Sequence, residues 1–371
     1  MENKIKNFRI NVLDGFRGIA ILLVLLFHFF SRWTSLYPYG DKYDFFTYGK
    51  MGVHLFFIIS GFVILYTLEN TNDFITFWKK RMIRLFPSML IASFITYFVF
   101  NLFDTELLFP TSHLFKNILA SITFIQPDLL SSLLRHRIEL DYISGSYWSL
   151  WPEIQFYLFV STIYFFNKNK FAFVFFSFTF ILILSNFILH HIYNDNYFVK
   201  TVRNFFIIFN FIESLPYFCF GVLFYLIYKN KMLQKEIPRY LNIYLSGMVL
   251  FQTYGNYSEP FELVIVFSFL LLFIGLIYYP RVIKFLENKI LMKIGISSYF
   301  LYLIHENIGV LIIHKYGSFF TNYEFILPLA LILFLVFISI LYTYKIEKLI
   351  NNYLKNTLVK KRNIPTQKNN N

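Results

Sequence analysis

Charged residues are scarce in this sequence, at 15% of 371 residues, whereas soluble domains carry roughly a quarter. Cysteine is nearly missing as well: Cys219 is the only one, and it lies inside an apolar run, so the chain cannot form an internal disulfide. The lack of charge argues against a soluble globular domain. Both shortages fit a protein that lies mostly within a membrane and has little structure outside it.

Apolar residues take the place of the missing charges. They make up 57% of the chain, and the mean hydropathy is +0.54. The net charge of +13 would indicate a nucleic-acid partner in a soluble protein, but basic residues also mark the cytoplasmic loops of membrane proteins. We therefore expect the lipid bilayer as a partner, and no nucleic acid.

The apolar residues are grouped into runs of membrane-spanning length. A helix needs about 20 mostly apolar residues to cross a bilayer, and we find ten such runs, of which the seventh is short. They cover about 12–31, 50–68, 85–103, 147–166, 171–190, 204–228, 240–254, 261–279, 294–314 and 325–344. The sequence thus predicts an all-α integral membrane protein, a bundle of about ten transmembrane helices.

The distribution of lysine and arginine predicts the orientation of this bundle. With the N-terminus inside, the cytoplasmic segments hold 24 of these residues and the outside loops hold nine. Basic loops face the cytoplasm. Both termini are therefore predicted to be cytoplasmic, in a bacterial-type inner membrane.

The chain divides after the last predicted span. Residues 1–345 are predicted to form the membrane domain, and residues 346–371 a cytoplasmic tail that starts as a basic surface helix and ends in polar residues. The first span follows a basic segment, as a signal peptide does. However, Asp14, Arg17 and His28 interrupt it and no small-x-small site follows, so we expect a retained helix.

Ionisable residues within the spans are the first candidates for chemistry, because a charge inside a membrane is expensive. The alternative for each is a structural polar contact between helices. The candidates are Asp14, Arg17, His28, Glu153, Glu213, His305 and Glu306. Arg17 and His28 are almost three full turns apart and lie on one helix face, about 16 Å from each other along the axis.

A basic stretch follows the second span, in the segment FWKKRMIRLFP. It contains Lys79, Lys80, Arg81 and Arg84. One interpretation is that these residues only set the topology and bind anionic lipid. The other is that they hold the phosphates of a cytoplasmic donor, since arginine forks match phosphate oxygens.

The second span itself, GVHLFFIISGF, carries small residues at helical spacing. Gly52, Ser60 and Gly61 would allow neighbouring helix backbones to approach closely. This pattern alone is more typical of packing than of chemistry.

The segment YWSLWPEIQFY is the most distinctive in the chain. Trp148 fits an interfacial aromatic belt. Glu153 lies below the outer surface with Tyr157 on its face, at a depth comparable to that of His28. A carboxylate beside a histidine is the arrangement that general-base chemistry on a hydroxyl requires. We therefore predict that Glu153 and His28 work together.

His305 is the second intramembrane histidine among the candidates, and it shares a helix face with Ser298 and Tyr302.

A metal site is not expected, because His190 and His191 are adjacent rather than helix-spaced and no group of carboxylates accompanies them.

Five segments taken together resemble the membrane-bound acyltransferase-3 family, in the order in which that family carries them. They are LDGFRGIAILLVLLFHF, GVHLFFIISGF, KKRMIRLFP, WSLWPEIQFY and SYFLYLIH. The family's first-span pattern is an arginine, ten residues and a histidine, which Arg17 and His28 match. The sequence departs from the family at His54, where an aspartate is common, and after Glu153, where a second glutamate is common.

The resemblance implies about ten spans and an acyl-CoA donor, usually acetyl-CoA, with the sugars of surface glycans or small molecules as acceptors. We therefore predict transfer of an acetyl group from cytoplasmic acetyl-CoA to a hydroxyl of a surface polysaccharide or glycolipid sugar. His28 would act as general base, charge-balanced by Glu153. The donor phosphates would be held by Arg17, Arg81 and Arg84. Supporting or substrate-binding roles would fall to Asp14, Ser60, Trp148, Tyr157, Tyr302 and His305.

Two other functions suit intramembrane polar residues. A transporter or flippase of a glycan or lipid intermediate would use them along a substrate pathway, but we find no inverted repeats with interrupted helices in matching halves. A glycan polymerase would be expected to have more spans and a larger outside loop. The order of the five motifs favours the acyltransferase.

Overall fold

The computed structural model describes residues 10–191, 196–255, 259–320 and 322–359. Within these ranges the chain forms helices joined by turns and contains no strand. The all-α prediction is therefore confirmed for this part of the chain. The predicted basic N-terminal segment and the polar end of the tail lie outside the described residues.

Seven helical stretches of the described chain are long and apolar enough to cross a membrane. Six of them include α2 (Asn11–Phe30), α3 (Gly52–Glu69) together with the preceding η2 (Asp44–Met51), α4 (Phe74–Phe103), α8 (Phe171–His191), α10 (Phe211–Met232) and α12 (Pro260–Tyr278). The seventh joins α16 (Ile326–Leu341), η7 (Tyr342–Glu347) and α17 (Lys348–Leu358). These helices make the chain a multi-pass membrane protein.

The other three predicted spans are also helical, but they are short or interrupted. Helices α7 (Leu150–Phe166) and α11 (Arg239–Gly255) have 17 residues each. The predicted span at 294–314 is divided into α13 (Lys289–Ile296), α14 (Ser298–Ile304) and α15 (Glu306–Tyr316). The count of ten crossings therefore stays a prediction.

The segment between α4 and α7 contains several short helices. These are η3 (Pro110–His113), α5 (Phe115–Thr123), α6 (Pro127–Leu133) and η4 (Gly145–Ser149).

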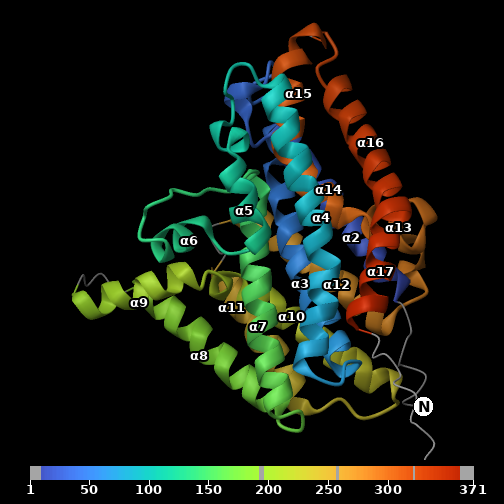
Figure 1. Ribbon diagram of the computed structural model, residues 1–371. Helices are drawn as coiled ribbons and strands as arrows, with labels where there is room; N and C mark the ends of the chain where they lie inside the picture. Colours follow the sequence, from blue (N-terminus) through green and yellow to red (C-terminus); the bar gives the residue numbers. More distant parts are fainter. Residues whose placement is uncertain (1–9, 192–195, 256–258, 321, 360–371) are drawn as a thin grey trace, which may run out of the picture.

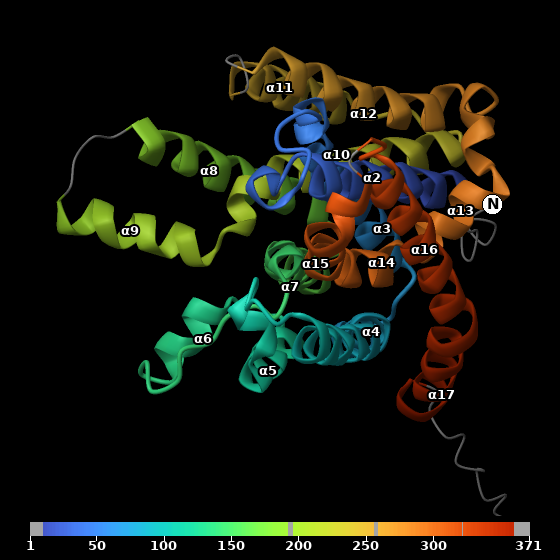
Figure 2. The same ribbon diagram turned by 90° about the horizontal axis from the view of Figure 1, so that it is seen from above.

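In both views α8 and α9 (Tyr197–Ile208) project from one side of the bundle (Figures 1 and 2). We call the end of the bundle at which α2 begins the basal end, and the end at which α2 finishes the apical end.

Three helices form the centre of the bundle. Seen from above, α2, α3 and α10 lie between α12 on one side and α4 on the other (Figure 2). Helix α10 is the most enclosed, with 83% of its apolar window buried, against 39% for α4 and α12. Asp14 and His28 of α2 and Ser60 of α3 are also buried, so these polar residues face protein rather than lipid.

The contact between α3 and α10 depends on two glycines that face each other. A Cβ atom on Gly61 would lie 2.2 Å from the backbone oxygen of Phe218, and one on Gly221 would lie 2.0 Å from that of Ile58. The predicted close approach at Gly61 is thus confirmed. Gly52 likewise lies against the backbone of α2, whereas the side chain of Ser60 is used differently, as described below.

This contact predicts the effect of one methyl group. We expect Gly221→Ala to destabilise the folded protein by about 1–3 kcal/mol, because backbone atoms of α3 cannot move aside without separating the helices. Gly247→Ala is the matched control: Gly247 lies within α11 with no atom within 4 Å of the new methyl group. Thermal unfolding of the purified proteins in detergent should show a lower Tm for the first variant only. Equal Tm values would contradict this account of the packing.

Candidate active site

Three cavities adjoin one another along the axis of the bundle. The basal cavity is about 800 Å³, the inner cavity about 80 Å³ and the apical cavity about 450 Å³. The basal and inner cavities share walls formed by Arg17, Arg81 and Arg84. The inner and apical cavities share Val53 and Tyr302. The three cavities therefore form a row from the basal to the apical end, in which neighbouring cavities share wall residues.

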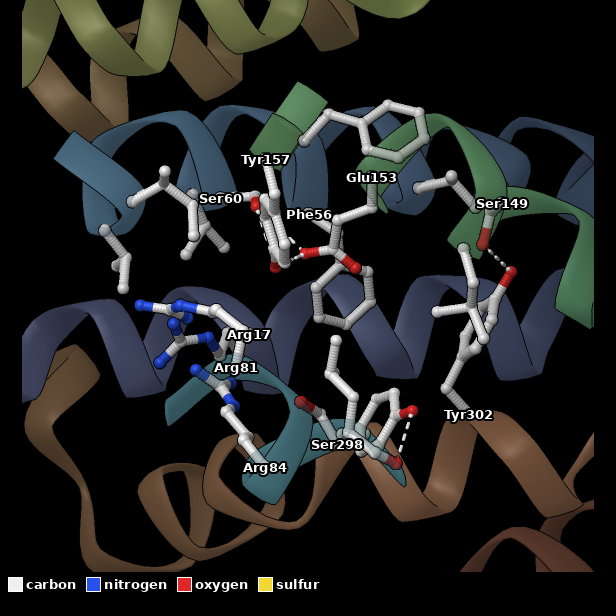
Figure 3. Close-up of a pocket in the computed structure, with 18 residues that line it drawn as sticks. Arg17, Phe56, Ser60, Arg81, Arg84, Ser149, Glu153, Tyr157, Ser298 and Tyr302 are labelled. Atoms are coloured by element: carbon white, nitrogen blue, oxygen red, sulfur yellow. Dashed lines mark hydrogen bonds between the residues drawn. The ribbon is translucent and has the colours of Figure 1, made fainter. Parts of the chain in front are cut away.

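Three arginines surround the opening between the basal and inner cavities, and we call them the arginine collar: Arg17 from α2, and Arg81 and Arg84 from α4. Their guanidinium groups gather on one side of the inner cavity (Figure 3). Arg17 forms an ion pair with Asp14, with 3.0 Å between Nη1 and Oδ1. Three like charges repel one another, so this arrangement favours an anion between them.

Arg81 is the most buried member of the collar. Only 6% of it is exposed, its guanidinium lies over the rings of Phe77 and Tyr157, and one nitrogen donates to Thr67 Oγ1 at 2.5 Å. Its Nε atom has no hydrogen-bond partner among the described residues. A buried cation that is only partly satisfied is a ready partner for an anionic ligand.

A carboxylate faces the collar from the opposite side of the inner cavity. Glu153, from the first turn of α7, accepts hydrogen bonds from Ser60 Oγ at 2.9 Å and from the hydroxyl of Tyr157 (Figure 3). The side chain of Ser60 therefore lines the cavity instead of packing between helices. Glu153, Ser60 and Tyr157 form one polar cluster, in which two hydroxyl groups hold the carboxylate.

Tyr302, on α14, separates the inner cavity from the apical cavity. Its hydroxyl lies 2.8 Å from Ser149 Oγ and donates to the backbone oxygen of Ser146, also at 2.8 Å. Both serines belong to η4, directly before α7. Figure 3 shows Tyr302 and Ser149 at the end of the inner cavity opposite the arginines. Two hydrogen bonds therefore fix the side chain that closes the path.

The apical cavity contains a histidine paired with a carboxylate. His28 Nδ1 lies 3.2 Å from Glu306 Oε1, and both residues are buried, with 9% and 3% exposed. Glu306 begins α15 immediately after the interruption between α14 and α15. Because Glu306 contacts the ring at Nδ1, Nε2 is the ring nitrogen that stays available to a ligand.

The surroundings of this pair are also ordered. The ring of His305 contacts that of His28, with 4.8 Å between centroids, and His305 Nδ1 lies 2.7 Å from the backbone oxygen of Tyr302. The hydroxyl of Tyr37 donates to the backbone oxygen of His28. His305 lines none of the three cavities, so it supports the ring of His28 without reaching the cavities itself.

One predicted pairing was wrong. The carboxylate in contact with His28 is Glu306 and not Glu153, which lines the inner cavity beyond Tyr302. Depth along the helices placed Glu153 and His28 at a similar level, but it gave no information on which faces meet. Glu306 was a candidate as an intramembrane ionisable residue, and its position directly after His305 was the available signal.

The structure brings the other predicted site residues into this one system. Arg17, Ser60, Arg81, Arg84, Glu153, Tyr157 and Tyr302 line the inner cavity, Asp14 lines the basal cavity, and Trp148 lines the apical cavity with His28. His54, the departure noted above, also lines the apical cavity and stacks on Tyr217 with 4.1 Å between centroids. Asn351 and Lys355 of α17, a helix predicted to belong to the cytoplasmic tail, line the basal cavity.

Comparison with known proteins agrees with the motif analysis. A family model described as "Acyltransferase domain" matches residues 10–345. The O-acetyltransferase OatA of Staphylococcus aureus (strain NCTC 8325 / PS 47) is 27% identical over 338 residues, which is 81% of this chain and 50% of the relative. An O-acetyl transferase of Shigella phage Sf6 is 30% identical over 167 residues, 44% of this chain and 49% of the relative.

The chain thus spans about half the length of the curated relatives that it matches. No solved structure matches it significantly.

Proposed function

Because this chain belongs to the acyltransferase-3 family, whose domain covers residues 10–345, we propose that it transfers an acetyl group from cytoplasmic acetyl-CoA to a hydroxyl of a surface polysaccharide or glycolipid sugar. One observation carries this proposal. Cations surround one end of a path through the bundle, and a histidine–carboxylate pair lies at the other end. A donor and an acceptor can therefore reach one reaction centre from opposite sides.

The basal cavity suits the donor. Acetyl-CoA carries its phosphates at one end and its thioester at the other, joined by a thin uncharged arm. The arginine collar matches the diphosphate, because guanidinium groups bind phosphate oxygens through paired N–H bonds. The arm would then enter the inner cavity, where the Glu153 cluster offers a hydrogen-bond acceptor to its amide N–H groups.

The basal end faces the cytoplasm in this proposal. The donor is a cytoplasmic metabolite, and the basic residues of α4 that form the collar lie near its basal start. The predicted orientation, with the basic loops inside, places them on the same side.

The apical cavity suits the acceptor and the chemistry. His28 Nε2 takes the proton of the sugar hydroxyl, and the hydroxyl oxygen attacks the thioester carbonyl carbon. The C–S bond breaks, the sulfur leaves as the thiolate of CoA, and the imidazolium returns the proton to it. Glu306 keeps the ring in position and stabilises its charged form. The thioester reaches His28 only when Tyr302 moves from its bonds to η4.

A transporter or flippase is the alternative that also uses a path through the bundle. The narrow inner cavity, of about 80 Å³, argues against it, because a wide ligand would have to open the path further than a thin chain would. A sugar-lipid intermediate would require much more room than the arm of CoA.

The role of His28 gives a direct test. We expect His28→Ala to lower glycan O-acetylation by about 10²–10⁴-fold, the usual effect of losing a general base, while the protein still accumulates in the membrane. His314→Ala is the matched control, because this histidine of α15 lines none of the three cavities. Mass spectrometry of surface glycans from a complemented deletion strain measures the change. Near-normal acetylation by His28→Ala would refute the assignment.

The arginine collar gives a second test. Arg17→Ala, and Arg81→Ala combined with Arg84→Ala, should each weaken CoA binding roughly tenfold or more, as expected for lost charge-assisted contacts of about 1.5–3 kcal/mol. Lys79→Ala should change it little, because Lys79 lies on α4 but lines neither the basal nor the inner cavity. Calorimetric titration of CoA into the detergent-solubilised variants measures the affinities. If all of them bind CoA equally, the basic stretch serves only topology or lipid binding.

A further inference from the structure

The helix that follows the family match forms a wall of the basal cavity. The match ends at residue 345, and α17 covers Lys348–Leu358. Nevertheless, Glu347, Asn351, Lys355 and Val359 line this cavity together with the arginine collar. These residues recur every fourth position, so they share one helix face.

The adjacent side of α17 is held by apolar contacts that fix this orientation. Leu354 and Leu358 line an apolar groove together with Trp78 and Met82 of α4. Lys79 Nζ donates to the backbone oxygen of Leu358 at 3.3 Å. Figure 1 shows α17 at the basal end of the bundle. Because Leu354 and Leu358 pack on α4, they hold the adjacent fourth-residue face of α17 against the basal cavity.

The face of α17 that lines the cavity carries polar groups that are not fully used. Asn351 Nδ2 donates to Glu347 Oε1 at 3.4 Å, while Asn351 Oδ1 is buried and has no hydrogen-bond partner among the described residues. Lys355 is exposed toward the cavity. The chain reaches this position through η7, a π-helical turn, and such turns are frequent at functional sites.

The charges of the basal cavity are arranged in two groups. The arginine collar lies at the entrance to the inner cavity, whereas Lys80 and Lys355 line the basal cavity alone. The carboxylates are Asp14, which is paired with Arg17, and Glu347, which accepts from Asn351. The cavity therefore has cations on α2 and α4 and a further cation, Lys355, on α17, which fits a ligand with more than one anionic group.

Acetyl-CoA has this distribution of charge. Its diphosphate follows the thin arm directly, and its bulky adenosine with a 3′-phosphate lies beyond. Only the arm is thin enough to enter the inner cavity of about 80 Å³, so the nucleotide must remain in the basal cavity of about 800 Å³. A lysine ammonium suits a lone phosphate as a point charge, and arginine forks suit the diphosphate.

We infer that α17 completes the donor site: Lys355 and Asn351, with Lys80 opposite, bind the 3′-phosphoadenosine end of the donor. The inference rests on the proposed function, because it takes acetyl-CoA as the donor. It gives the C-terminal helix a role in binding, in place of a tail outside the catalytic domain.

The test compares donors with and without this end. Full-length protein in detergent is titrated at low ionic strength with acetyl-CoA and with S-acetyl-4′-phosphopantetheine, which keeps one phosphate and lacks the second phosphate and the 3′-phosphoadenosine. Lys355→Gln should raise the Kd for acetyl-CoA about three- to fivefold, the size of an exposed charge contact, and leave the Kd for the shorter donor unchanged. Asn351→Ala should show the same selectivity. Arg84→Gln should raise the Kd for both donors.

Two controls isolate the fourth-residue face. Lys348→Gln and Asn352→Ala change the same residue types on α17 at positions that do not line the cavity, and both should bind both donors as the wild type does. If Lys355→Gln behaves like Lys348→Gln, or weakens both donors equally, the role of α17 is refuted while the proposed function stands. If the wild-type protein binds neither donor, the assignment of the donor itself fails, and the proposed function fails with it.

Discussion

The structure depends on one constraint: an ionisable group inside an apolar bundle has to be paired, hydrogen-bonded or hydrated. Several ionic groups of the site meet this requirement through neighbouring side chains. Asp14 pairs with Arg17, Ser60 and Tyr157 hold Glu153, and Glu306 holds His28. These contacts place a row of polar cavities in the centre of the bundle, where α2, α3 and α10 exclude lipid.

The division of the path explains how such a site can work. In the proposed reaction donor and acceptor approach from opposite sides, and an open path would let water reach the thioester. The narrow inner cavity and the side chain of Tyr302 keep the two sides apart. Tyr302 is anchored by η4, the segment that also begins α7 and so positions Glu153. One turn of the chain therefore holds both the barrier and the carboxylate next to it.

The sequence was sufficient for features that depend on position along a helix. Apolar runs predicted the helices, the spacing of Arg17 and His28 placed them at the two ends of the site, and Gly61 predicted a close helix contact. Features that depend on the rotation of one helix against another were not predictable. The partner of His28 is one such case, because Glu153 and Glu306 are both intramembrane carboxylates and only the packing of α14 and α15 decides between them.

The role of α17 was missed for another reason: its sequence is polar enough to resemble a surface tail, and only its packing on α4 turns one face toward the cavity.

The central claim is that one donor spans the path from the arginine collar to His28. The most direct measurement is a structure with a non-reactive thioether analogue of acetyl-CoA. The account predicts the diphosphate between Arg17, Arg81 and Arg84 and the acetyl carbonyl beside His28, with Tyr302 displaced. An analogue bound elsewhere, or one whose arm stays outside the inner cavity, would contradict it.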